Sequence, residues 1–543
     1  MRSRDAHGSL AKLTAEVLCF GLASGALLAA QPAPQPAPIP RPPMGWSSWN
    51  SFSNTVDAHN VMDQARAIAA NGMKKAGYVY VNIDEGWWTG PRDAQGNIVV
   101  DPKQWPALAP GELPGDMSNI VRFIHNLGLK AGIYTDAGSA GCSMYPDLGP
   151  KYFHAGSEGH YEQDFLQFAR WGFDYVKVDW CGGDSEHLDP AVQYAQVARA
   201  IARAEATTAH PLYFSICEWG KNSPWTWAPN IAGSPADIWR TSGDIVPPIV
   251  AGHEHADRKA SFVKMLANFD RGIHPQAQHT GYYNDPDMMV LGMPGLTEEQ
   301  NRLHMALWAI SGAPLLAGAD LTKLTQAELA DFTNPSVVAI DQDPAGLQAV
   351  MVSEPTPGVQ VWSKPLAETG KRAVLLLNRT PSAGSVSVKW ADLGLTGAAP
   401  TIRNAWSGDP LQASGDAYST TVPAGDGVLL LIAGQDLPAA AYKPSDAAGE
   451  VLRTHPVRFV NVHARSSLAR IQIVYRNPSP KTRFASLQVN GEVITTVAFP
   501  STRTNAAEYV WVQANLNPAD SGNTLDFSTG CDPGPVIHSI RVQ

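Results

Sequence analysis

The sequence lacks the excess of basic residues that proteins binding nucleic acid carry. Lys and Arg number 40 against 50 Asp and Glu, which gives a formal net charge of -10 at pH 7. Because like charges repel, we expect neither nucleic acid nor an anionic membrane surface as a partner. Charged residues make up 17% of the chain and hydrophobic residues 44%, a balance typical of a folded globular protein.

Several catalytic signatures are also missing. The sequence contains no G-x-S-x-G segment to form the nucleophile elbow of an esterase and no H-E-x-x-H pair to bind zinc. No Gly-rich dinucleotide loop follows the first predicted strand. The segment His253-Glu254-His255 resembles the paired His residues of metal-dependent barrel hydrolases, but it lies in a polar stretch beyond the sixth predicted strand. We expect that segment to be a solvated loop, because ligands there would need convergent geometry.

Cysteine is scarce, with 5 residues in 543. Cys19 lies in an apolar run, Val17 to Ala30, that follows three basic residues and ends in small ones, so residues 1–30 are predicted to be a signal peptide. The run is too short to favour a permanent membrane span, and we expect a secreted or periplasmic protein that leaves the membrane after cleavage. In an oxidising compartment four cysteines allow three disulfide connectivities. The remaining cysteines are Cys142, Cys181, Cys217 and Cys531.

The first two thirds of the chain predict a (β/α)8 barrel. Residues 31–43, QPAPQPAPIPRPP, form a Pro-rich linker. Over residues 44–343 short apolar runs alternate with helix-like segments, which indicates a parallel sheet covered by helices, with chemistry at the carboxyl ends of the strands. A doubly wound open sheet is the alternative. The predicted strands are Met44–Trp49, Tyr78–Asp84, Lys130–Asp136, Tyr175–Trp180, Leu212–Cys217, Asp237–Arg240, Tyr282–Asp285 and Pro314–Gly318.

Strands without intervening helices follow the barrel. Residues 344–435 are predicted to form an antiparallel β domain, with strands that include Arg372–Asn378 and Gly427–Ala433. The Pro- and Ala-rich residues 436–448 are predicted to be a second linker. Residues 449–543 predict a β-sandwich, either a carbohydrate-binding module or a structural domain without a ligand.

Carboxylates gather where the predicted barrel strands end. Burying a carboxylate is costly unless it is paired or hydrogen-bonded, so this many at one rim favour a polar ligand. Some of them could instead cap the helices that follow, since Asp is a preferred capping residue. The carboxylates are Asp84, Glu85, Asp136, Asp179, Glu218, Asp244, Asp285 and Asp287.

Two of these carboxylates suit the cleavage of a glycosidic bond. Lys177 lies two residues before Asp179 on the same face of its strand, where its charge would help to keep the carboxylate ionised. Asp244 follows the sixth strand, where a turn could bring it across the barrel mouth. A retaining glycosidase uses two carboxyl groups about 5–5.5 Å apart, and we assign Asp179 as nucleophile and Asp244 as acid/base. We expect Cys217 to be a buried small side chain and not a thiol nucleophile.

A set of short motifs is spread over the whole predicted barrel. They are Met44-Gly45-Trp46, Asp84-Glu85, Gly132 to Asp136, Lys177-Val178-Asp179, Cys217-Glu218-Trp219, Arg240 to Asp244, Asn284 to Met288, Ala313 to Leu316 and Asp341-Gln342-Asp343. In order and spacing they resemble the motifs of glycoside hydrolase family 27, the α-galactosidases and their relatives.

The resemblance implies a barrel followed by an antiparallel β domain, and hydrolysis with retention at the anomeric carbon. Asp179 matches the family nucleophile and Asp244 its acid/base, and neither a metal nor an organic cofactor is implied. Cys142 and Cys181 match a disulfide at the pocket wall. The residues that match sugar-binding positions are Trp46, Asp84, Glu85, Tyr134, Lys177, Glu218 and Arg240.

Glu85 departs from the pattern of α-galactosidases, which typically have two consecutive Asp residues here. The extra methylene would crowd the exocyclic CH2OH of galactose, a group that β-L-arabinopyranose lacks, and a similar Glu is found in family members that are β-L-arabinopyranosidases. The expected substrate is therefore a carbohydrate with terminal α-D-galactose or β-L-arabinopyranose, with Glu85 favouring the latter. The alternatives are an ordinary α-galactosidase, an isomaltodextranase-like enzyme and an inactive sugar-binding protein.

Overall fold

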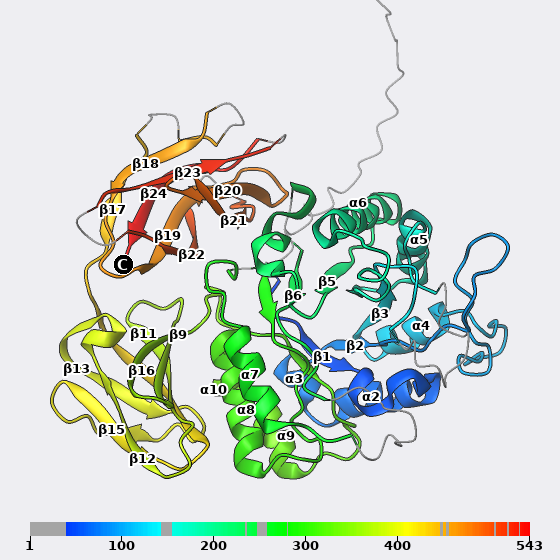
Figure 1. Ribbon diagram of the computed structural model, residues 1–543, viewed down its shortest axis with the longest axis horizontal. Coiled ribbons are helices and arrows are strands. Elements are labelled where there is room, and N and C mark those ends of the chain that lie inside the picture. Colours follow the sequence, from blue (N-terminus) through cyan, green and yellow to red (C-terminus); the bar gives the residue numbers. More distant parts are fainter. Residues whose placement is uncertain are drawn as a thin grey trace, which may run out of the picture. The chain divides into compact units, whose positions relative to one another are not determined.

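The computed structural model describes residues 40–142, 155–233, 236–246, 258–279, 281–445, 449–451, 455–503, 506–517, 521–530 and 533–543. The predicted signal peptide, most of the first linker, His253-Glu254-His255 and Cys531 lie outside these ranges. Figure 1 colours the barrel blue to green, the second domain yellow and the third orange to red. Over the described residues, no helix has both the length and the apolar character needed to span a membrane.

Eight parallel strands form one sheet in the order β7-β6-β5-β4-β3-β2-β1-β8. A parallel bridge between Met289, which follows β7, and Ala317 of β8 joins the two ends, so the sheet closes into a barrel. The barrel prediction is confirmed and the doubly wound alternative is wrong. The strands are β1 Met44–Ser47, β2 Tyr80–Asn82, β3 Lys130–Asp136, β4 Tyr175–Asp179, β5 Tyr213–Cys217, β6 Ile238–Arg240, β7 Tyr283–Asp285 and β8 Leu315–Ala317.

Several of the barrel helices begin at residues whose side chains cap them. Asp189 accepts a hydrogen bond from the backbone of Val192, with Pro190 in the first turn of α6. Thr297 and Gln300 form a reciprocal capping box at the start of α8. The helices are α1 Trp49–Phe52, α2 Ala58–Ala70, α3 Met73–Ala76, α4 Ser118–Asn126, α5 Tyr161–Trp171, α6 Pro190–Thr208, α7 Phe262–Arg271, α8 Glu298–Ser311, α9 Gln326–Phe332 and α10 Pro335–Asp341.

The second domain is antiparallel, as predicted. A six-stranded sheet has the order β14-β13-β16-β11-β10-β9, and β12 pairs with β15 in a second sheet. β13 was not predicted because most of its residues are exposed and give no hydrophobic alternation. The strands are β9 Val350–Thr356, β10 Val359–Pro365, β11 Lys371–Asn378, β12 Gly384–Lys389, β13 Leu395–Asn404, β14 Pro410–Leu411, β15 Ala417–Val422 and β16 Asp426–Asp436.

The third domain is a β-sandwich of two four-stranded sheets, β17-β24-β19-β22 and β18-β23-β20-β21, around a core of its own. The stretch predicted as a linker, residues 436–448, contains β17, which pairs with β24 from Ala440 opposite Val542. Part of that stretch therefore belongs to a sandwich sheet. The strands are β17 Ala440–Tyr442, β18 Val457–Val462, β19 Leu468–Arg476, β20 Arg483–Val489, β21 Glu492–Phe499, β22 Glu508–Asn515, β23 Asn523–Ser528 and β24 Val536–Val542.

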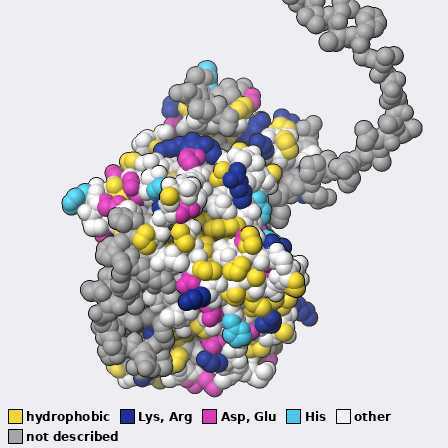
Figure 2. Space-filling model, turned by 90° about the vertical axis from the view of Figure 1, so that its right-hand side faces the viewer, with side chains coloured by type: hydrophobic (Ala, Val, Ile, Leu, Met, Phe, Trp, Pro, Cys, Tyr) yellow, Lys and Arg dark blue, Asp and Glu magenta, His cyan; other side chains and the backbone are white. Residues whose placement is uncertain are grey.

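The face of the molecule in Figure 2 carries side chains of both charges. Lys and Arg are interspersed with Asp and Glu, and hydrophobic side chains gather between them. On this face the net negative charge of the chain is therefore not concentrated in one acidic patch.

Two ion pairs that involve α5 allow burial to be tested as a source of stability. The side chains of Arg92 and Asp164 are 8% and 3% exposed and lie 2.6 Å apart, whereas those of Arg203 and Glu162 are 62% and 56% exposed. Arg92→Ala would leave the Asp164 carboxylate buried without its cation, so we expect the free energy of unfolding to fall by about 3–5 kcal/mol. Arg203→Ala, the matched control, should lower it by less than about 1 kcal/mol. Urea unfolding followed by tryptophan fluorescence measures both, and equal losses would contradict the role of burial.

Candidate active site at the barrel mouth

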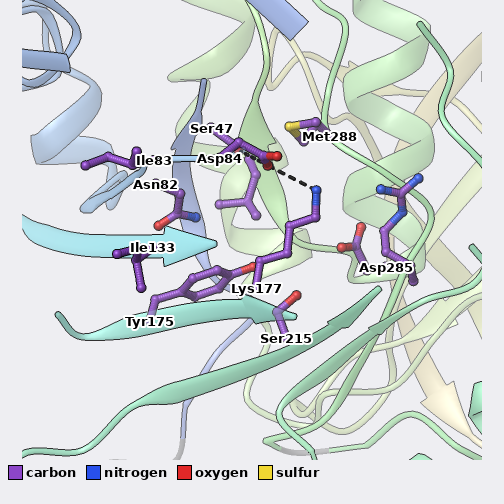
Figure 3. A pocket seen from close by; sticks show the side chains of 12 residues that line it. Ser47, Asn82, Ile83, Asp84, Ile133, Tyr175, Lys177, Ser215, Asp285 and Met288 are labelled. Carbon is purple, nitrogen blue, oxygen red and sulfur yellow. Dashed lines mark hydrogen bonds and ion pairs between the residues drawn. The ribbon is translucent and has the colours of Figure 1, made fainter. Parts of the chain in front are cut away.

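The carboxyl ends of β1 to β6 bring the predicted site residues to one end of the barrel. Asp179 is the last residue of β4, and Lys177 lies two residues earlier, with its Nζ 3.6 Å from Asp179 Oδ2. Lys177 Nζ is closer to Asp84 Oδ2, at 3.0 Å, and Figure 3 shows the two side chains directed toward each other. The predicted proximity of Lys177 and Asp179 is confirmed, and Asp84, two residues after β2, is the nearer partner.

Burial and neighbouring charges shift the pKa values of Asp179 and Lys177 in opposing directions. Burial raises the pKa of Asp179 above its ordinary value, and the charge of Lys177 opposes this shift. The expectation that Lys177 favours the carboxylate is therefore correct in direction, but burial outweighs it. For Lys177, burial alone would lower the pKa, but Asp84 and then other anionic neighbours raise it well above its usual range. Lys177 is thus a permanent cation between two carboxylates.

Asp244 lies in the turn after β6, beside the arginine that ends that strand. Arg240 Nη2 lies 3.0 Å from Asp244 Oδ1 and donates a hydrogen bond to the carbonyl of Ser242. The Arg240 side chain is 3% exposed and that of Asp244 is 29% exposed, so the Asp244 carboxylate is accessible. After burial and Lys177, the charge of Asp244 is the next influence on the pKa of Asp179 and raises it. The two carboxylates are therefore near enough to interact.

A second group of acidic side chains is fully buried next to Asp179. Tyr134 donates a 2.7 Å hydrogen bond to Asp136 Oδ1. Burial first, and then the charges of Glu85 and Asp179, raise the pKa of Asp136 well above its ordinary value. Glu85 is 1% exposed, so its carboxylate is buried close to Asp136. Sequence reasoning noted Asp136 at a strand end but assigned it no role.

Glu218 follows β5 in a loop that requires a glycine. Gly220 has a φ of +73°, and a Cβ there would lie 2.0 Å from the carbonyl oxygen of Thr241, so only glycine permits this loop to pack on the turn leading to Asp244. Glu218 Oε2 accepts hydrogen bonds of 2.7 and 2.9 Å from Asn222. Burial raises the pKa of Glu218 to about 7, against these hydrogen bonds.

Three carboxyl oxygens at the site are buried without a hydrogen-bond partner in the described part of the chain. One of them, Asp287 Oδ1, lies 3.0 Å from Nη1 of Arg240 in an ion pair, and the other two are Glu218 Oε1 and Asp136 Oδ2. Buried polar atoms are normally satisfied, so Glu218 Oε1 and Asp136 Oδ2 are each suited to form a hydrogen bond with a ligand hydroxyl.

A cavity of about 20 Å³ lies in the barrel at the level of Lys177 (Figure 3). It can hold about one water molecule and is too small for a sugar ring, so it forms the floor of the site. Sequence reasoning missed Ser47, Asn82, Ser215 and Met288 there, although the two-residue period of the strands would have found Ser215. The lining residues are Ser47, Asn82, Ile83, Asp84, Ile133, Tyr175, Lys177, Ser215, Arg240, Asp285, Met288 and Leu316.

The two aromatic residues predicted to contact the sugar are buried. Trp46 has no exposed surface and donates a hydrogen bond to the carbonyl of Ala319. Tyr134 is 1% exposed and stacks on Trp88. A contact between a sugar and either ring stays a prediction.

Cys142 and Cys181 form a disulfide with a Cα–Cα distance of 5.0 Å. Together with Asp136 they are the one set of potential metal ligands found over the described ranges, but both sulfur atoms are in the disulfide and cannot act as thiolate ligands. Cys217 is a buried free cysteine, and burial raises the pKa of its thiol well above the ordinary value. The expectation that Cys217 is a buried small side chain is met.

Comparison with known proteins covers the barrel and the second domain. The family model described as Alpha galactosidase A matches residues 41–343, and the one described as Alpha galactosidase C-terminal beta sandwich domain matches residues 356–432. Alpha-galactosidase A of Cellvibrio japonicus is 38% identical over 377 residues, which is 69% of this chain and 85% of that protein.

Solved structures agree with this match. Alpha-galactosidase I from Mortierella vinacea has a TM-score of 0.61 and 28% identity, covering 73% of this chain and 97% of that chain. A β-L-arabinopyranosidase from Geobacillus stearothermophilus also has a TM-score of 0.61, with 21% identity over 72% of this chain and 96% of that chain. At 21% identity, the similarity to the β-L-arabinopyranosidase shows a common fold alone.

The disulfide joins residues 39 positions apart and can be tested directly. In the double variant Cys142→Ser, Cys181→Ser we expect the free energy of unfolding to fall by about 2–4 kcal/mol, because without the bridge the unfolded chain has more conformational freedom. Peptide mapping without reduction should recover the linked pair from the wild type, while the buried Cys217 stays unlabelled until unfolding. Alkylation of Cys142 and Cys181 in the folded, unreduced protein would contradict the bridge.

Proposed function

Because the chain belongs to the α-galactosidase family, we propose that it is a retaining exo-glycosidase with Asp179 as nucleophile and Asp244 as general acid/base. The observation that carries the proposal is the pairing of each carboxylate with a cation at the barrel mouth, Asp179 with Lys177 and Asp244 with Arg240. Chemistry at the carboxyl ends of the strands is the rule for this fold.

The proposed reaction uses one carboxyl group as nucleophile and the other as proton donor. The Asp179 carboxylate attacks the anomeric carbon while Asp244 gives its proton to the leaving oxygen, which forms a covalent glycosyl-enzyme. Asp244, now a carboxylate, removes a proton from water, and the water oxygen attacks the anomeric carbon from the face that the leaving group vacated, opposite Asp179. The bond to Asp179 breaks, and the product has the configuration of the substrate. Lys177 stabilises the ionised Asp179 that the first step needs, against the effect of burial.

Sugar recognition is proposed to use the remaining polar groups. Lys177, Arg240 and Asp84 offer charged groups to ring hydroxyls, and Glu218 Oε1 is a buried acceptor. A hydroxyl that donates to Glu218 would satisfy this oxygen, which supports binding of a terminal sugar deep in the barrel mouth.

We propose that the substrate carries a terminal α-D-galactosyl or β-L-arabinopyranosyl residue and that Glu85 favours the arabinopyranoside. Asp84 can hold the axial 4-hydroxyl that both sugars share, while the longer Glu85 side chain disfavours the CH2OH of galactose. α-Galactosidase as the main activity is the second candidate, supported by the names of the relatives. Assays on three aryl glycosides would distinguish these two activities from an isomaltodextranase-like enzyme and from an inactive sugar-binding protein.

We also propose that the chain is exported after loss of residues 1–30. The disulfide at the barrel mouth supports this, because such bonds persist in oxidising compartments.

Substitution of the two carboxylates should have different consequences. Asp179→Asn should abolish turnover and leave sugar binding intact, because it removes the nucleophile with little change of shape. Asp244→Asn should lower kcat/KM by about 10²–10⁴-fold on substrates with poor leaving groups, but much less on p-nitrophenyl glycosides, which need little protonation. NMR of the first product checks the stereochemistry, and an inverted anomer from the wild type would refute both roles.

Glu85→Asp tests the proposed sugar preference. The shorter side chain should make room for the CH2OH group and move the ratio of kcat/KM toward p-nitrophenyl α-D-galactopyranoside by about 10-fold or more. The wild type should prefer p-nitrophenyl β-L-arabinopyranoside. Glu368→Asp removes the same methylene from a side chain that is 68% exposed and serves as the control. An unchanged ratio in Glu85→Asp would exclude Glu85 as the selector without affecting the catalytic roles.

A further inference from the structure

Asp287 has a strained backbone and no exposed surface. Its φ is +111°, a conformation that residues other than glycine rarely adopt, and it is 0% exposed. The Trp308 indole donates a 3.0 Å hydrogen bond to its carbonyl, and its own N–H donates to Asp285 Oδ1 at 2.9 Å. Such strain persists only where the surrounding structure fixes it, and it is frequent beside active sites.

The Asp287 carboxylate holds both ends of the turn that carries Asp244. Oδ1 lies 3.0 Å from Nη1 of Arg240, where the turn begins, and Oδ2 accepts a 2.7 Å hydrogen bond from the N–H of Ile245, directly after Asp244. The other terminal nitrogen of Arg240, Nη2, lies 3.0 Å from Asp244 Oδ1. Asp287 and Asp244 therefore share one guanidinium.

Uncharged contacts hold the same turn. Asn268 of α7 donates through Nδ2 to the carbonyls of Gly243 and Pro286, at 2.7 and 2.9 Å. Ser242 Oγ donates to the carbonyl of Pro286 at 3.1 Å. The segment after β7 is thus bound to the turn at several points, and Asp287 adds a charge to this attachment.

We propose that Asp287 is a positioning residue for the acid/base Asp244 and acts through the Arg240 guanidinium that the two carboxylates share. The inference rests on the proposed function of Asp244. Fixing the turn at Arg240 and Ile245 aims the Asp244 carboxyl at the glycosidic oxygen. The negative charge of Asp287 also offsets part of the field that Arg240 exerts on Asp244.

Among the described residues, a small set of charged and titratable groups surrounds this pair. Asp244 interacts electrostatically with Arg240, Asp179, Asp287 and the buried thiol of Cys217. Lys264 Nζ lies 3.4 Å from the backbone oxygen of Asp244. Asp287 interacts with Arg240, Asp244 and Asp285, and burial raises its pKa to about 7 while Arg240 opposes the shift. Burial likewise raises the pKa of Asp285.

The test is the pH dependence of kcat/KM for Asp287→Asn on an activated p-nitrophenyl glycoside and on a methyl glycoside of the same sugar. Removing the Asp287 charge takes one carboxylate away from Arg240 and strengthens the field of Arg240 on Asp244, so the alkaline limb should move to lower pH by about one unit. Activity should fall about 10-fold or more on the methyl glycoside, which requires protonation, and much less on the activated one. The control is Asp341→Asn, because burial also raises the pKa of Asp341. It should change neither the position of the alkaline limb nor the difference in activity between the two substrates.

A second variant separates geometry from charge and covers failure of Asp287→Asn to fold. Trp308→Phe keeps the Asp287 charge but removes the hydrogen bond to the Asp287 carbonyl. Activity should therefore fall more on the methyl glycoside than on the activated one, and the alkaline limb should not shift. An equal loss on both substrates in either variant, or an unshifted limb in Asp287→Asn, would overturn the inference. Asp244→Asn is measured in parallel: absence of leaving-group dependence there would instead refute the proposed role of Asp244.

Discussion

The site depends on two cations that lie between carboxylates from different strands. Lys177 of β4 lies between Asp84, which follows β2, and Asp179, and Arg240 of β6 lies between Asp244 and Asp287. Buried carboxylates in this number would repel one another and take up protons, and burial does raise the pKa of Asp179. Each cation stabilises two anions at once, so the loss of either would change the protonation of the site as well as its geometry.

Hydrogen bonding within the protein leaves part of this charge unsatisfied. Glu218 and Asp136 each keep one buried oxygen without a partner over the described residues, and burial raises the pKa of both groups. The protein bears this cost in the unliganded state, because such atoms would otherwise be hydrogen-bonded. A polyhydroxylated ligand can form hydrogen bonds with both oxygens, whereas an apolar ligand would leave them unsatisfied. The arrangement is thus consistent with the proposed sugar ligand.

Local pattern was sufficient to predict the barrel and the closeness of Lys177 to Asp179, because strands have a period of two and parallel strands end at one edge. Other features depend on contacts that no local pattern contains. The pair of Arg240 and Asp287 spans 47 positions of the chain and needs a left-handed backbone at a residue that disfavours it. The extent of burial around Asp179 depends on the whole barrel. Reasoning from Lys177 alone therefore predicts a lower pKa for Asp179 than the buried site gives. Strand β17 was hidden by a Pro- and Ala-rich composition typical of linkers.

The buried pair of Glu85 and Asp136 changes how a sugar preference at position 85 should be understood. Burial and the charge of Glu85 together raise the pKa of Asp136, and Tyr134 donates to the same carboxylate. A change in the length or charge of residue 85 therefore alters the protonation of Asp136 and the hydrogen bonds that Asp136 and Tyr134 can offer. The space for a CH2OH group and the donors and acceptors around it then vary together. The proposed selectivity at position 85 would therefore depend on the three side chains together, because steric room and proton occupancy there cannot be changed independently.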